Sequence, residues 1–146
     1  MWIAVLGSVK LFPNLAAALK GVFNRVMTTL GLVGNNIGPE GSIAIAEALK
    51  VNAVVTTLYL HRNSIGDEGA ITIAEALKVT AVVATLRLNS NNIGDEGAKA
   101  IAEALKVNAV LTKLDIRANN MGDAGGKAVR DAVKGRSGFV LELYGK

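Results

Sequence analysis

The chain alternates between two hydrophobic rhythms. Leu58, Leu86 and Leu114 each begin a short stretch in which apolar and polar residues alternate, as expected for a strand with one buried face. Later in each stretch, apolar residues recur at helical spacing, as in Ile73-Ala74-Glu75-Ala76-Leu77. The pattern predicts units made of one strand followed by one helix.

These units form an internal repeat of 28 residues. Residues 58–85 and 86–113 agree at 18 of 28 positions, an earlier copy spans 30–57, and a looser copy begins at Leu114. Asp67 lies just before the helical stretch of its repeat, and Pro39 occupies the same position in the earlier copy. Proline is favoured at the first helical position, and an acidic residue there meets the positive end of the helix dipole. A helix is therefore predicted to start at this position in every repeat.

One strand and one helix cannot bury their own apolar faces, so neighbouring repeats must stack. Paired strands lie about 4.8 Å apart, whereas packed helices need about 8–10 Å between their axes. This difference bends the stack and places the strands on the concave side and the helices on the convex side. Strand–helix–parallel strand connections are right-handed. The predicted fold is an α/β solenoid, a right-handed horseshoe with a parallel sheet.

Asparagine occurs five residues after the leucine that opens each strand. At this spacing the side chains can form a ladder that binds backbone groups left open where the strands turn away. The ladder residues are Asn35, Asn63, Asn91 and Asn119. The phrase L-x-L-x-x-N-x-I/L-G-x-x-G resembles the leucine-rich repeats of the ribonuclease-inhibitor-like family, from about Leu30 to Leu143. The resemblance implies an α/β horseshoe that recognises other proteins. It does not extend to inhibition of a ribonuclease, because this chain is short, cysteine-free and nearly uniform.

The two ends of the chain depart from the repeat. Residues 1–29 match it poorly and are predicted to form a divergent N-terminal capping repeat, with a strand near Trp2 and a helix after Pro13. Residues 30–146 are predicted to hold four repeats that end in a final strand at Leu141–Leu143. Because no helical pattern follows that strand, we expect the last core layer to be covered by a second copy of the chain or by further sequence.

Composition narrows the setting and the class of partner. The 146 residues make one domain, and the lack of cysteine favours the reducing cytoplasm. No apolar run reaches the roughly 18–20 residues of a membrane span. The formal net charge of +4 favours acidic partners, but the lysines recur singly rather than in a cluster, which argues against nucleic acid.

The sequence offers little for catalysis. His61 is the single histidine and has no cysteine, histidine or carboxylate cluster around it in the sequence, so neither a metal site nor a nucleophilic triad is predicted. The glycines of 34–42 lack the lysine of a phosphate-binding loop. Glu75 and Lys78, with their counterparts in other repeats, are expected to form ion pairs on the convex face. We predict a protein that is not an enzyme and uses no cofactor.

The residues between and just after the strand leucines differ most from repeat to repeat, and they are predicted to point outward from the concave face. They are Tyr59, His61, Arg62, Arg87, Asn89, Asp115 and Arg117. Tyrosine and arginine are enriched among residues that dominate protein interfaces. We predict that this strip binds a protein partner of acidic character. Ordinary solvated strand residues are the plain alternative.

Two other functions stay open at this point. Repeat length and phrase also resemble those of Ran GTPase-activating proteins, which implies regulation of a small GTPase. The near-identity of the repeats is equally typical of a structural or engineered scaffold.

Overall fold

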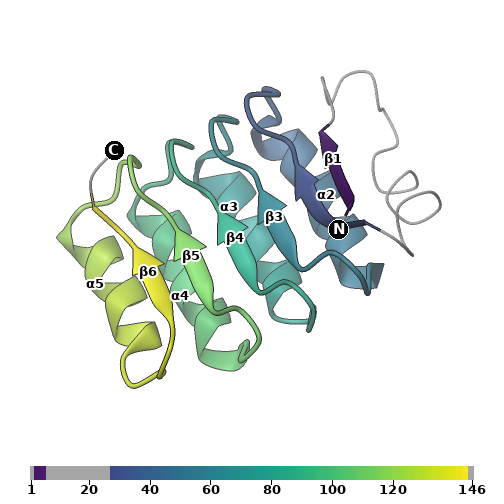
Figure 1. The fold of residues 1–146 in the computed structure, drawn as a ribbon. Coiled ribbons are helices and arrows are strands. Elements are labelled where there is room, and N and C mark those ends of the chain that lie inside the picture. The colour runs from purple at the N-terminus through teal and green to yellow at the C-terminus, as the bar shows by residue number, and fades with distance from the viewer. Residues whose placement is uncertain (1, 6–26, 145–146) are drawn as a thin grey trace.

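The chain forms a solenoid with a parallel sheet on one side and a row of helices on the other (Figure 1). The computed structural model describes residues 2–5 and 27–144. The sheet runs in the order β1-β2-β3-β4-β5-β6, with every neighbouring pair parallel. The strands are β1 (Trp2–Val5), β2 (Met27–Gly31), β3 (Thr57–Tyr59), β4 (Thr85–Arg87), β5 (Lys113–Asp115) and β6 (Val140–Glu142). The helices are α2 (Gly38–Val51), α3 (Gly66–Leu77), α4 (Asp95–Val107) and α5 (Asp123–Val133). This arrangement confirms the predicted α/β repeat solenoid.

The strand leucines stack in register and build the core. Leu30 pairs with Leu58, Leu58 with Leu86, Leu86 with Leu114, and Leu114 with Leu141. They meet the apolar side of the helices, where Ile, Ala and Leu recur at helical spacing and are almost completely buried. The many alanines let each helix lie close to the sheet. The core therefore runs unbroken through the stack, as neighbouring repeats bury each other's faces.

The described residues include only part of each end of the chain. Trp2–Val5 is a strand and pairs with β2, while the helix predicted after Pro13 falls outside the described residues. The capping role of residues 1–29 thus stays a prediction. The last strand starts one residue earlier than expected, at Val140, and leaves Leu143 just beyond it.

Asp67 binds the helix of the following repeat. Its Oδ1 accepts hydrogen bonds from the backbone N–H groups of Gly94 and Gly97, both at 2.8 Å. Asp95 binds Gly122 and Gly125 in the same way, at 2.8 and 2.9 Å. We expected these acids to interact with the dipole of their own helix. Stacking also brings each carboxylate to the open N–H groups at the start of the next helix.

Proline at position 39 changes the backbone of the next repeat. Since Pro39 provides no carboxylate, the N–H of Gly66 donates instead to the Asn91 carbonyl at 2.8 Å. Gly66 then has a φ of +69°, a conformation that favours glycine. Gly94, which binds Asp67, has a φ of −97°. One substitution in a repeat therefore sets the backbone of its neighbour.

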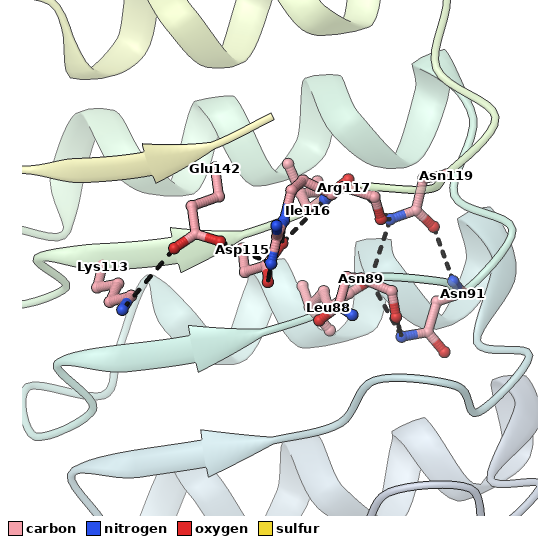
Figure 2. A network of polar contacts seen from close by, with 9 residues as sticks. All are labelled: Leu88, Asn89, Asn91, Lys113, Asp115, Ile116, Arg117, Asn119 and Glu142. Carbon is pink, nitrogen blue, oxygen red and sulfur yellow. Dashed lines mark hydrogen bonds and ion pairs between the residues drawn. The ribbon is translucent and has the colours of Figure 1, made fainter. Parts of the chain in front are cut away.

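The asparagines form a ladder that runs along the turn after each strand. The Oδ1 of Asn91 accepts from the N–H groups of Asn63 and Ile65, at 2.8 and 3.3 Å. Its Nδ2 donates to the carbonyls of Leu60, Leu88 and Asn89. Asn63 and Asn119 make the corresponding contacts, and Figure 2 shows Asn91 beside Asn119. Each of these three side chains thereby joins two repeats, whereas within the described residues the Asn35 side chain donates only to the Val33 carbonyl of its own repeat.

The convex face carries the expected ion pairs in three repeats. Glu47–Lys50, Glu75–Lys78 and Glu103–Lys106 are separated by 3.5, 3.0 and 2.7 Å. In α5 the expectation was wrong, because Asp131 pairs with Lys127, one turn earlier, rather than with Lys134. None of the described helices is long and apolar enough to span a bilayer.

Candidate functional site

The side chains between the buried leucines form two rows on the open side of the sheet, which we call the strand face. In the first row Tyr59, Arg87, Asp115 and Glu142 are register partners across β3 to β6. The second row follows two residues later, at His61, Asn89 and Arg117. Leu58 and Leu60, which alternate with these positions, are completely buried. The alternation of each strand therefore presents the predicted residues together.

Tyr59, His61 and Arg87 form one cluster on the strand face. The guanidinium carbon of Arg87 lies 4.8 Å from the centre of the Tyr59 ring, a cation–π contact. The His61 ring meets Tyr59 edge-on, with 6.2 Å between ring centres. Arg62 follows at the end of the strand, where it is exposed and has a φ of +60°. The cluster gives a rigid aromatic platform with a cation held on it.

The charges around His61 disfavour its protonated form. Burial lowers the pKa of His61 from its ordinary value, and the neighbouring positive charges of Arg87 and Arg62 lower it further, against a smaller opposite effect of Asp115. The imidazole is thus neutral at physiological pH, so the positive charge of this cluster resides on the two arginines.

Asp115 is not available to a partner in the way we expected. Its side chain is buried and receives hydrogen bonds from the Nε, NH2 and backbone N–H of Arg117, at 3.0, 2.8 and 3.1 Å (Figure 2). Burial alone would raise the pKa of Asp115, but these hydrogen bonds and the charge of Arg117 outweigh it and hold the pKa below its ordinary value. Asp115 therefore positions Arg117 instead of presenting a carboxylate.

Two residues absent from the predicted strip complete this network. Glu142 lies 2.8 Å from the NH2 of Arg117 and 3.8 Å from the Nζ of Lys113. The register signal was available in the sequence, since Glu142 follows Leu141 as Asp115 follows Leu114. Together the two carboxylates and the two cations balance each other in charge.

Arg62 and Arg87 are the cations that remain. Neither forms an ion pair with any residue of the described ranges 2–5 and 27–144. The strand face consequently has a neutral, internally bonded half around Arg117 and a positively charged half around Arg87.

Polar atoms of the same cluster lack partners. The Nδ1 of His61, the Nε of Arg87 and the Oδ1 of Asn89 are buried and form no hydrogen bond with the described residues. A buried polar group without a partner costs free energy, and it gains on meeting a complementary group.

Among residues 2–5 and 27–144, no group of three or more histidine, cysteine or carboxylate side chains could hold a metal ion. The strand face is built from hydrogen-bonding and aromatic groups. Such a surface is suited to contact with another macromolecule.

Comparison with known proteins gives a family and a structural relative. The family model described as "Leucine Rich repeat" matches residues 23–46, 51–74, 83–102 and 107–129. No curated protein matches the chain. Among solved structures, the chain is similar to "Leiomodin-1 Actin-Binding Site 2 (ABS2)", with 27% identity and a TM-score of 0.77, over 92% of this chain and 79% of that one.

Proposed function

Because this chain belongs to the leucine-rich repeat family, we propose that it is a protein-interaction module whose strand face binds an acidic segment of another protein. Within the family, the repeat phrase L-x-L-x-x-N-x-I/L-G-x-x-G favours the ribonuclease-inhibitor-like group. The absence of cysteine favours action in the cytoplasm.

One observation supports the proposal most directly. Arg87 is stacked on Tyr59 without a carboxylate partner among the described residues, while Arg117, one repeat further, is fully paired. An arginine held on an aromatic ring is oriented before binding, so less side-chain freedom is lost when a carboxylate arrives. A partner carboxylate paired with Arg87, and a second one near Arg62, would neutralise the positive charge of this half of the strand face.

The test is selection of binding peptides followed by substitution. A random peptide library displayed on phage is panned against the immobilised chain, and the selected peptides are measured by fluorescence anisotropy against R87A, Y59A and the convex-face control K106A. We expect selected peptides to be rich in Asp and Glu, with R87A and Y59A each weakening binding about tenfold or more and K106A leaving it unchanged. Peptides without acidic residues, or equal binding by R87A, would refute the proposal.

Actin is a second candidate partner, supported by the similarity to the leiomodin-1 actin-binding site. Cosedimentation with filamentous actin and native gel shift with monomeric actin test it directly. Binding that R87A removes would identify actin as a ligand of the strand face. Binding that R87A leaves intact would place actin on another surface, and no binding would exclude actin.

The remaining proposals concern assembly and the alternative functions. At the last repeat, Tyr144 is largely exposed beside an open depression of about 600 Å³ that Arg117, Arg130 and Leu143 help to line. Self-association there predicts a concentration-dependent mass in light scattering. Regulation of a small GTPase predicts faster GTP hydrolysis on addition of the chain, and a purely structural scaffold predicts neither effect.

A further inference from the structure

A groove on the convex face lies between α2 and α3, away from the strand face. Its apolar walls are Ile43 of α2 and Ile71 of α3, which are 53% and 39% exposed. It has a volume of about 340 Å³, and its rim carries two carboxylates. The lining residues are Pro39, Glu40, Ile43, Glu68, Ile71 and Thr72.

The later repeats have lysine at the positions that these isoleucines occupy. Ile43 and Ile71 occupy the register that Lys99 and Lys127 occupy in α4 and α5. Lysine has a higher helix propensity than the β-branched isoleucine, and in α4 it pairs with Glu96 at 3.7 Å. With isoleucine at this position, α2 and α3 lack both the higher helix propensity and the ion pair, and they expose apolar surface instead. Neighbouring apolar residues left exposed together are typical of interaction sites.

The same exchange leaves the two rim carboxylates without cations. Glu40 and Glu68 stand three residues before Ile43 and Ile71, as Glu96 stands before Lys99. In the described part of the chain, neither forms an ion pair. The groove thus combines aliphatic walls with a rim whose carboxylates are not paired with cations of the described residues.

We propose that this groove binds a short segment of a partner protein in which an aliphatic side chain is flanked by arginine or lysine. The aliphatic group packs between Ile43 and Ile71, and the basic groups pair with Glu40 and Glu68. This charge preference is opposite to that proposed for the strand face. The chain would therefore hold two different segments on its two sides.

The test uses two variants that add the same charge at different places. I43K/I71K gives the first helices the lysines of the later ones. V79K/V107K is the matched control, because Val79 and Val107 are 63% and 67% exposed and lie outside the groove. Thermal melts by circular dichroism establish that both variants fold, which the native Lys99 and Lys127 lead us to expect. The strand-face variant R87A is measured alongside.

The probes are three fluorescein-labelled peptides of twelve residues. The first carries two leucines flanked by arginines, the second has glutamates in place of the arginines, and the third has serines in place of the leucines. We expect the first peptide alone to bind at micromolar concentration, and I43K/I71K to weaken it about tenfold or more. V79K/V107K and R87A should bind it as the unmodified chain does.

Several outcomes would overturn the proposal. Equal binding by I43K/I71K, or equal loss in V79K/V107K, would mean that the groove is not the site. Equal binding of the serine peptide would reduce the effect to charge attraction. A concentration-dependent dimer that I43K/I71K abolishes would identify a second copy of the chain as the occupant. Failure of the strand-face proposal would show separately, in the R87A measurements with acidic peptides.

Discussion

Asp67 holds the start of a helix that belongs to the next repeat, through the hydrogen bond that its Oδ1 accepts from the N–H of Gly97 at 2.8 Å. The same oxygen accepts from Gly94. A side chain that satisfies two open N–H groups at a helix start acts as a cap, although it comes from another helix. The stacking of repeats is therefore specified by polar contacts as well as by the apolar core.

Replacing this carboxylate should weaken the joint between the second and third repeats. We expect D67A to lower the free energy of unfolding by about 1–2 kcal/mol, since two helix N–H groups lose their acceptor. Urea unfolding followed by circular dichroism measures the change. The adjacent E68A, an exposed residue, should stay within about 0.5 kcal/mol of the unmodified chain. Equal stability of D67A and E68A would contradict the capping role.

The asparagine ladder predicts a larger loss. N91A removes five side-chain hydrogen bonds. It leaves the buried N–H groups of Asn63 and Ile65 without an acceptor, while each of the three carbonyls keeps one other donor. A loss of about 3 kcal/mol is expected. N91D should be nearly as damaging, because a carboxylate cannot donate to the three carbonyls. Denaturant unfolding provides the values, and E103A, which breaks one exposed ion pair, is the control. A loss below 1 kcal/mol for N91A would refute this account.

The contact between Asp115 and Arg117 predicts that the free energy of unfolding changes with pH in the acidic range. The folded state lowers the pKa of Asp115 below its ordinary 3.8, so this contribution to stability is complete above that pH and is lost as the pH falls through the lower, folded value. R117A should cost about 2 kcal/mol at neutral pH, because a buried carboxylate loses its donors.

The measurement is unfolding by urea between pH 2 and pH 7. The dependence on pH below 4 should be shallower in R117A than in the unmodified chain. E142Q alters the exposed side of the same network and should change stability by less than about 1 kcal/mol. Parallel pH curves for R117A and the unmodified chain would contradict the prediction.

His61 offers a direct probe of the strand face, because it is the single histidine. Its proton resonances should titrate with a midpoint below 6.5, and R87A should raise the midpoint by removing a nearby positive charge. Stability from the neutral ring is complete above pH 6.5 and declines as the pH falls toward the lowered pKa. A midpoint at or above 6.5 would contradict the lowered pKa, and a midpoint unmoved in R87A would show that Arg87 does not act on this ring.

Most of the fold could be predicted from the periodicity of the sequence. The spacing of the leucines was enough to predict the strands, the parallel sheet and the buried side of each helix, because every repeat must bury its apolar faces against its neighbours. Contacts between repeats were harder to foresee. The sequence shows that Asp67 precedes a helix, but its acceptance of hydrogen bonds from Gly94 and Gly97 depends on how closely the helices stack.

The strand face was predictable as a set of positions but not as a pattern of charge. Alternation placed Tyr59, Arg87 and Asp115 on one side of the sheet. Whether a charge there is free depends on the side chains around it, and Arg117 is paired both with Asp115 of its own repeat and with Glu142 of the last strand. The resulting contrast between a paired Arg117 and an unpaired Arg87 arises only from the three-dimensional arrangement.

Two kinds of polar contact between repeats run in opposite directions along the chain: Asp67 reaches forward to Gly97, and Asn91 reaches back to Asn63. A 28-residue repeat such as residues 86–113 thus carries the donors and the acceptors for both kinds of contact. Tandem duplication of such a segment in a gene would regenerate the bonds at the new junction without any compensating mutation. A duplicated first repeat, with Pro39 in place of the aspartate, would lack one of them, so the later repeats are the better source for growth of the array.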